Sequence, residues 1–535
     1  MLRRAALAFW LPVAAATALS AGLLVPYLSD RVMHRDEALA VMVARRPLGE
    51  LLETVQLVRG GAPLHFLLVA VIELAGGGLT AARLLSAIAA CVAVVAIALL
   101  GRALFGPIEG VVAAAGLAAC PVALYYGEFA RMYALFLAVT TLALWCLVRA
   151  LDEGGRWWFG AAVLLALNVY VHPYGVVVGI AAGLAVLVST LRRYERERWR
   201  APLLTGGGIV LGTLPLAAGY LVLASRHGAV HTPNGRPLRT PPTLDTVHQA
   251  FANFLGVPRA DSVLTPTGLY AIAAAVLVLI GLALAARRDP AHGVLLALLL
   301  VLPPLVIAFV QVPGTDNHVR YVIEALPAIL VCLAHGGVEL ARRISPVGAL
   351  AVGAALAIAL PVVDLERGRH LADYRYRGGD TTSTRQALDG AAAWLRESFA
   401  PHDVVFGYDP VWGNAVLHPG SNRALEDARG TARAEGPLIV RSLDRLHGPI
   451  AHGWYVALLR RPAGLPAFRA SLGRGFEARR FGSFVIVRTT APSLDRQRFA
   501  RAALSVFEAA GRDLGDPQAP TTSAALSAAV PDVRP

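Results

Sequence analysis

Long apolar segments with few charges constrain this chain more than any other feature. A helix needs about 20 mainly apolar residues to cross the roughly 30 Å hydrocarbon core of a bilayer. After an apolar N-terminal stretch, the candidate spans are residues 82–105, 109–125, 131–150, 157–172, 174–191, 203–223, 264–286, 293–312, 321–341 and 346–363. The sequence therefore predicts an α-helical polytopic membrane protein with about eleven spans.

The composition agrees with a membrane protein. The 535 residues are 56% hydrophobic and 16% charged, with a mean hydropathy of +0.56, whereas soluble domains carry about 25% charged residues. A net charge of +13 would suggest nucleic acid in a soluble chain, but here arginines cluster at the ends of apolar segments. Membrane orientation explains that pattern, so we expect a lipid bilayer and no nucleic acid as partner. The cysteines lie inside apolar runs, without a disulfide framework or zinc spacing.

Two segments near the N-terminus determine the topology. The run after Arg3-Arg4 fits either a cleaved signal peptide or a retained helix; because it continues to Tyr27, we expect a retained helix that starts in the cytoplasm. The stretch 63–76 is too short for a comfortable span and contains Glu73, which favours an interfacial helix. Residues 28–81 then form an exterior loop. The remaining arginine clusters then fall on the cytoplasmic side.

With this topology, separate polar groups share the exterior side of the membrane. They are Asp36-Glu37, Arg59 with His65, Glu128 with Arg131 and Tyr133, His172 with Tyr174, and the run 316–321 with His318, Arg320 and Tyr321. Carboxylates next to a span are costly near lipid and are functional candidates for that reason. We expect segments 36–46 and 47–58 to be short helices on the membrane surface. The loop 225–262 is either a mobile segment over the site or a linker.

The long apolar segments end at residue 363, and the rest of the chain has the composition of a soluble domain. Strand-like runs at 404–408, 438–440, 454–459 and 484–487 mix with helix-like stretches before 399 and at 493–513. We therefore expect an exterior α/β domain over 364–513, after a catalytic membrane domain over 1–363. The Pro-, Ser-, Thr- and Ala-containing tail, 514–535, is predicted to be disordered.

The exterior groups suit sugar transfer from a lipid-borne donor. Asp36 or Glu37 can act as a general base toward an acceptor hydroxyl. Arg59, Arg131, His318 and Arg320 are candidates to hold the donor phosphate, because arginine matches phosphate with two hydrogen bonds. The sequence has no Walker motif, which favours a membrane-embedded donor over a soluble nucleotide sugar.

Five stretches of residues 1 to about 360 resemble the GT-C superfamily of polyprenyl-phosphate-sugar-dependent glycosyltransferases. They are Asp36-Glu37-Ala38-Leu39, 63–68, 81–86, Pro121 followed by 126–133, and Arg320-Tyr321 followed by Leu326-Pro327. The resemblance is to bacterial mannosyltransferases, arabinosyltransferases, lipid-A-modifying enzymes and protein mannosyltransferases. It implies that the acidic pair holds the catalytic base, that Glu128 is a second carboxylate, and that a basic residue before Pro63 touches the donor phosphate. Arg59 lies four residues before Pro63, a departure from the family pattern.

This resemblance also sets the expected substrates. We expect a polyprenyl-phosphate sugar donor, mannose being the first candidate, and a glycan, lipid or protein acceptor outside the plasma membrane of a bacterium. His65 and His172 are candidate substrate-binding residues, with Tyr321 beside the donor phosphate. No cofactor is certain; a divalent metal near the paired carboxylates is one possibility, although two acidic residues do not define a site.

Simpler interpretations stay open for several of these residues. Asp36-Glu37 could cap the helix that follows, and Glu128 with Arg131 could be an ion pair at a helix start. Arg83 could snorkel to the interface, His172 could merely end a helix, and the run 318–321 could anchor one. The competing function classes are a transporter or lipid-linked-sugar flippase and a membrane receptor. The charges at the ends of the spans, rather than at mid-membrane, favour the enzyme.

Overall fold

The computed structural model describes residues 2–26, 28, 35–58, 61–193, 199–227, 266–310, 322–375, 390, 393–394, 397–398, 400, 402–407, 449–482, 484–490, 494–516 and 519–529; for some of these, including Asp36, it describes the backbone only. The chain divides into two compact units. The first contains Met1–Arg31 and Pro47–Arg375, and the second contains Val32–Arg46 and Tyr376–Pro535.

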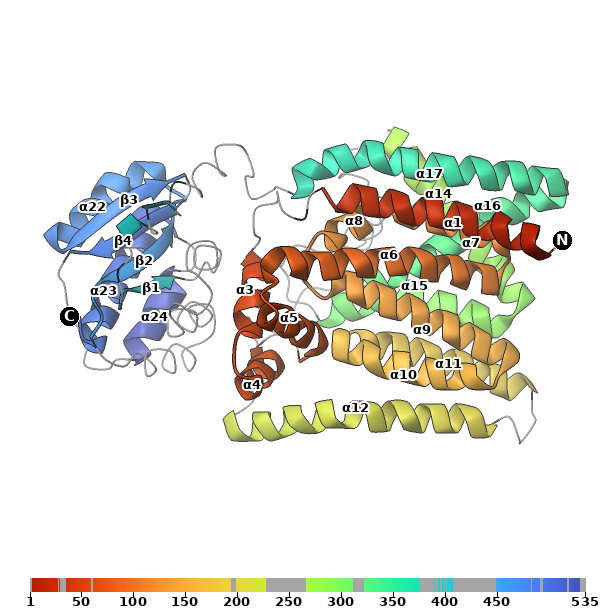
Figure 1. Ribbon diagram of the computed structural model, residues 1–535, viewed down its shortest axis with the longest axis horizontal. Coiled ribbons are helices and arrows are strands. Elements are labelled where there is room, and N and C mark those ends of the chain that lie inside the picture. The colour runs from red at the N-terminus through yellow and green to blue at the C-terminus, as the bar shows by residue number, and fades with distance from the viewer. Residues whose placement is uncertain are drawn as a thin grey trace. The chain divides into compact units, whose positions relative to one another are not determined.

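The first unit is a bundle of helices, most of them long and lying side by side (Figure 1). They are α1 (Leu2–Leu24), α6 (Gly78–Leu104), α7 (Pro107–Ala118), α8 (Pro121–Gly127), α9 (Tyr133–Glu153), α10 (Arg156–Val171), α11 (Gly175–Arg193), α12 (Arg200–His227), α14 (Pro266–Arg288), α15 (Pro290–Val310), the short η3 (Ile323–Ala325), α16 (Leu326–Ile344) and α17 (Pro346–Arg375). Among the described residues, seven helices are long and apolar enough to span a membrane, and the bent pair α7–α8 makes an eighth. The polytopic fold is confirmed, and the predicted count of about eleven stays a prediction.

Local sequence sets the turns between these helices. Proline opens α7, α8, α14, α15 and α17, where its missing N–H costs nothing and its fixed φ suits the first turn. Gly154 and Gly155 have φ of 70° and 59°, which favours glycine and ends α9 before α10 begins. Most of the long helices begin and end within a few residues of the predicted spans; α17, which continues to Arg375, is the exception.

Close packing holds the bundle together. A side chain at Gly281 would clash with the carbonyl oxygen of Cys332, and one at Gly336 with that of Leu277. The backbones of α14 and α16 therefore touch, as small residues allow between membrane helices. Glu109 of α7 is fully buried and accepts a 2.6 Å hydrogen bond from Arg342 of α16.

Short helices lie at the end of the bundle where α6 begins (Figure 1). These are α4 (Leu48–Val58), which contacts α12, and α5 (Leu64–Leu74), which contacts α6. With 11 residues, α5 is about 16 Å long, so the predicted interfacial helix is indeed too short to span. The predicted surface helix 36–46 is α3 (Arg35–Ala44), which falls in the second unit.

The second unit contains a four-stranded sheet in the order β1-β2-β4-β3. Strands β1 (Val404–Gly407) and β2 (Gly453–Leu458) are parallel, while β4 (Phe484–Thr489) is antiparallel to both β2 and β3 (Phe476–Phe481). Around it lie α22 (Leu465–Leu472), α23 (Arg496–Ala509), α24 (Ala519–Ala529), the π-helical turn η6 (Ala510–Leu514), and the short turns η4 (Pro462–Gly464) and η5 (Gly473–Gly475). The predicted α/β domain is confirmed by this sheet and by three of the four expected strands.

Several details of this unit differ from the prediction. The tail from Leu514 was expected to be disordered, but α24 packs on α23, with Ala519 and Leu526 in the core. The boundary also differs from residue 363, because α17 continues to Arg375. Strand β3 escaped prediction because its Glu and Arg residues suit a partly exposed edge strand. The expected strand at 438–440 and most of the stretch before 399 lie outside the described residues.

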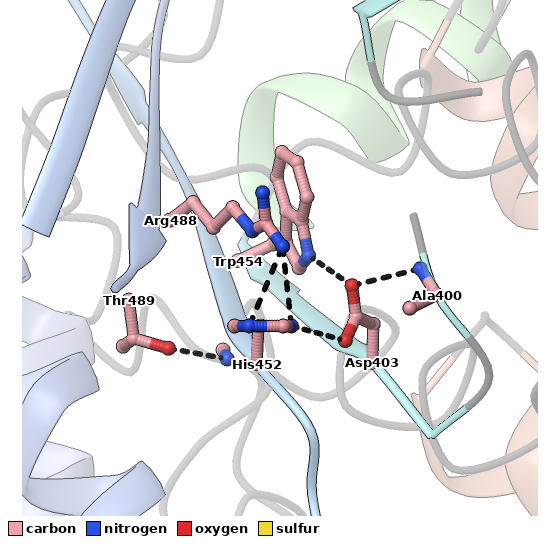
Figure 2. Close-up of polar contacts among 7 residues, drawn as sticks. Ala400, Asp403, His452, Trp454, Arg488 and Thr489 are labelled. Carbon is pink, nitrogen blue, oxygen red and sulfur yellow. Dashed lines mark hydrogen bonds and ion pairs between the residues drawn. The ribbon is translucent and has the colours of Figure 1, made fainter. Parts of the chain in front are cut away.

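A buried carboxylate joins β1 to β2 in this unit (Figure 2). Asp403 has no exposed surface. It accepts hydrogen bonds from the Trp454 indole at 2.8 Å, the His452 Nδ1–H at 2.9 Å and the Ala400 backbone N–H at 3.0 Å. Arg488 lies over the Trp454 ring, 5.1 Å from its centroid. Asp403 thus satisfies three donors at the start of the sheet.

Replacing Asp403 should weaken the second unit strongly. Each buried donor left without a partner costs about 1–3 kcal/mol, so we expect Asp403→Ala to lower the free energy of unfolding by about 3 kcal/mol. The matched control is Asp495→Ala, which removes the exposed N-cap of α23 and should cost about 1 kcal/mol. Pulse proteolysis of the full chain across a urea series measures both. Equal effects of the two changes would show that Asp403 has no special structural role.

Candidate functional site

The turn between α8 and α9 is the centre of the candidate site. The axis bends by 59° between α7 and α8, where Cys120 leaves the helix and Pro121 starts the next. Residues 128–132 then turn back before α9 begins at Tyr133. Ser86 of α6 donates a 3.4 Å hydrogen bond to the Arg131 carbonyl. The turn is thereby held against α6, with Glu128 fully buried beside it.

His65 approaches this turn from the first turn of α5. Its Nε2–H donates to the Ala130 carbonyl at 3.2 Å, which leaves Nδ1 as the ring's acceptor. Nδ1 is buried without a hydrogen-bond partner among the described residues. Burial, and then the nearby charge of Arg131, lower the pKa of His65 to about 3. His65 is therefore neutral at physiological pH and offers an acceptor rather than a positive charge.

Arg131 supplies the cation of the turn. Its guanidinium lies over the Phe66 ring, 5.6 Å from the centroid, a cation–π arrangement that fixes its direction. Its Nε is buried without a hydrogen-bond partner among the described residues. The alternative of a helical Glu128–Arg131 pair does not fit, because residues 128–132 lie between helices. Arg131 therefore retains donors for a ligand.

His172 joins the same end of the bundle through aromatic contacts. It ends α10, and its ring lies 5.8 Å from Tyr133, 4.8 Å from Phe136 and 5.1 Å from Tyr174, measured between centroids. Nδ1 accepts the Tyr174 backbone N–H at 3.2 Å. The neutral ring therefore carries its hydrogen on Nε2. The structure thus brings His65 and His172 against the turn that carries Glu128 and Arg131 and against Tyr133, which follows it.

Two further charged residues are buried in the first unit. Snorkelling is not what Arg83 does: it is 1% exposed and donates to the Leu28 carbonyl at 3.0 Å, so it ties α6 to the segment that follows α1. Glu324 of η3 was not singled out in the sequence. It is fully buried, and both carboxylate oxygens are without hydrogen-bond partners among the described residues. Its position near the start of a predicted span could have singled it out in the sequence, because carboxylates next to a span are costly near lipid.

The other predicted residues fall elsewhere. Asp36 and Glu37 lie in the first turn of α3, where Glu37 is 1% exposed; the Asp36 side chain lies outside the described part. Arg59, His318, Arg320, Tyr321 and most of the loop 225–262 also lie outside it. The structure therefore leaves their predicted roles untested.

Clusters that could hold a metal ion occur elsewhere in the first unit. Among the described side chains they are Glu109 with His335 and Glu339, and Asp152 with Asp289 and His292. In the first, Arg342 already pairs with both carboxylates. Neither contains a residue of the candidate site.

Comparison with known proteins identifies relatives of this architecture. Residues 62–217 match the family model for dolichyl-phosphate-mannose-protein mannosyltransferase. This match includes His65, Arg83, Glu128, Arg131 and His172. A comparison with the curated proteins returned no match.

Solved structures match over most of the chain. ArnT from Cupriavidus metallidurans in the apo state is 14% identical, with 89% of this chain and 97% of that chain covered and a TM-score of 0.58. The same protein bound to undecaprenyl phosphate is 15% identical, with 90% and 98% covered and a TM-score of 0.56. The apo oligosaccharyltransferase of Archaeoglobus fulgidus is 13% identical, with 84% and 69% covered and a TM-score of 0.50. The resemblance to GT-C glycosyltransferases is confirmed: this chain is a multi-pass membrane protein with their fold.

Proposed function

We propose that the chain is a membrane glycosyltransferase that moves a sugar from a polyprenyl-phosphate donor to a glycan, lipid or protein acceptor. The observation that carries the proposal is the convergence of His65, Glu128, Arg131 and His172 at one end of the bundle. These residues lie inside the segment that matches a mannosyltransferase model. The structure of ArnT, which has a similar fold, has been solved with undecaprenyl phosphate bound.

The roles follow from the chemistry of each group. Asp36 or Glu37 takes the proton of the acceptor hydroxyl as that oxygen attacks the anomeric carbon, and the sugar–phosphate bond breaks toward the lipid phosphate. Arg131, with Arg59, His318, Arg320 and Tyr321, stabilises the charge that develops on the phosphate. His65 accepts a hydrogen bond from a hydroxyl group, His172 binds the sugar, and Glu128 is the second carboxylate. Mannose is the first candidate sugar; whether hexose or pentose is transferred is a question for a donor panel.

The proposed orientation places the site and the second unit outside the plasma membrane of a bacterium. It follows from the arginines expected in the cytoplasm. A reporter fused after Asp364 that is active only in the cytoplasm would overturn it.

Transfer and transport assays separate the two candidate functions. The purified chain is reconstituted in vesicles with a polyprenyl-phosphate donor labelled in its sugar. We expect label to appear in a water-soluble or lipid acceptor fraction of a cell-envelope extract, with a first panel of mannose, glucose, galactose and arabinose donors. Movement of the labelled lipid between leaflets without transfer would instead support a flippase.

A further inference from the structure

The second unit has a cavity whose walls carry several arginines. It has a volume of about 500 Å³ and is lined by Trp394, Glu397, Arg469, Arg479, Arg480 and Phe481. Binding sites for small molecules usually have volumes of about 300–1,000 Å³. We call it the arginine cavity.

Each arginine is held by a contact that leaves other donors available. Arg469 donates through Nη2 to the Ala478 carbonyl at 3.2 Å, and Arg480 donates through Nε to the Gly482 carbonyl at 3.1 Å. Arg479 pairs with Glu477 through Nε and Nη2, at 2.9 Å and 2.8 Å. A guanidinium has five N–H donors. Each arginine therefore keeps several donors beyond the contacts described.

The wall of the cavity is tied to the core of the unit. The guanidinium carbon of Arg479 lies 4.5 Å from the centroid of the Trp394 ring. Trp394 packs edge-on against Trp454, with centroids 5.0 Å apart, and Trp454 donates to the buried Asp403. Asp403 (Figure 2) thus holds Trp454, against which the cavity-lining Trp394 packs. A binding group on such a rigid support loses less conformational entropy when it binds.

The charges of the cavity indicate the ligand. Among the described residues, three arginines and one carboxylate, Glu397, line the cavity, and a second carboxylate, Glu477, is paired with Arg479. Unused guanidinium donors match the planar or tetrahedral oxygens of carboxylate and phosphate. Phe481 and Trp394 add apolar surface, and the volume exceeds what one phosphate would fill. We propose that the arginine cavity binds a sugar that carries a phosphate or carboxylate group.

Such a ligand would be part of the acceptor, and this assignment rests on the proposed function. The proposed binding does not depend on the proposed function, because binding is measured without donor lipid. The simpler alternative is that Arg479 and Arg480 only protect the edge strand β3 from pairing with another chain.

Titration calorimetry on the full detergent-solubilised chain tests the proposal. The probes are glucose 6-phosphate, glucuronate, glucose and inorganic phosphate, at low and at high salt. We expect at least one of the two anionic sugars to bind more tightly than glucose and inorganic phosphate, and salt to weaken that binding. Comparing the phosphate and carboxylate probes identifies the group preferred. Equal binding of glucose, or no binding of either anionic sugar, overturns the proposal.

Matched variants locate the binding. Arg480→Gln and the double change Arg479→Gln with Arg480→Gln should each weaken binding by roughly tenfold or more, because hydrogen bonds to a charged group are lost. Arg501→Gln, an exposed arginine on α23 outside the cavity, should leave binding unchanged. Unfolded variants are recognised by pulse proteolysis, and Arg480→Gln breaks only one described contact. Undiminished binding in both folded variants overturns the proposal. Binding without sugar transfer would instead overturn the proposed function alone.

Discussion

Asp36→Asn should lower sugar transfer by roughly 10²–10⁴-fold, the usual effect of removing a general base. Asparagine keeps the size and the hydrogen-bonding oxygen of aspartate but cannot accept a proton at physiological pH. It also suits a helix start, so α3 (Arg35–Ala44) and the amount of protein in the membrane should be preserved. The measurement is the initial rate of transfer from labelled donor, at saturating donor and acceptor.

Two companion variants decide between the carboxylates. Glu37→Gln changes a residue that is 1% exposed in the same helical turn, and Glu50→Gln changes the first turn of the neighbouring α4. Because α4 is merely the next helix along the chain and Glu50 has no proposed role, we expect Glu50→Gln to transfer at the normal rate. If Asp36→Asn is also normal and Glu37→Gln alone is inactive, the base is Glu37. Normal rates in all three would remove the acidic pair from the mechanism.

Arg131→Gln should lower kcat by roughly 10²–10³-fold, as expected when a donor to a developing oxyanion is removed. Its cation lies over Phe66, and its Nε has no hydrogen-bond partner among the described residues, so a departing phosphate could receive its hydrogen bonds. Arg131→Lys should recover only part of the rate, because a point charge does not reproduce a planar fork.

The control lies near the C-terminal end of α9, the helix that follows Arg131. Arg149 of α9 is already bound to Glu153 and lies over Trp157, so Arg149→Gln should leave transfer unchanged. Rates are measured against donor concentration at fixed acceptor concentration. Full activity of Arg131→Lys would reduce Arg131 to a structural cation and shift the phosphate role to Arg59 or Arg320.

Local patterns were sufficient for the helices of the membrane unit. Apolar segments of about 20 residues, bounded by arginine, proline or glycine, can satisfy their backbone in lipid only as helices. The short length of 63–76 likewise indicated the interfacial α5 (Leu64–Leu74). The prediction that His65, Arg131 and His172 share one side of the membrane came from counting the spans, because the number of spans between two loops decides whether they lie on the same side.

Properties that depend on distant neighbours could not be read from the sequence. Arg83 could be interpreted as an interfacial anchor from the sequence; only its burial against the Leu28 carbonyl shows that it joins α6 to the segment after α1. The composition of 514–535 suggested disorder, yet α23 provides an apolar face on which α24 packs.

The sequence by itself determined the membrane class and most of the helix boundaries, because these depend on length, hydropathy and charge along the chain. Only the tertiary structure decided that His65 is neutral with an acceptor nitrogen that lacks a partner among the described residues, that Asp403 supports a sheet, and that three arginines of the second unit share a cavity. Protonation, burial and pocket formation depend on which distant segments exclude water from a side chain, and the order of residues along the chain does not specify those contacts.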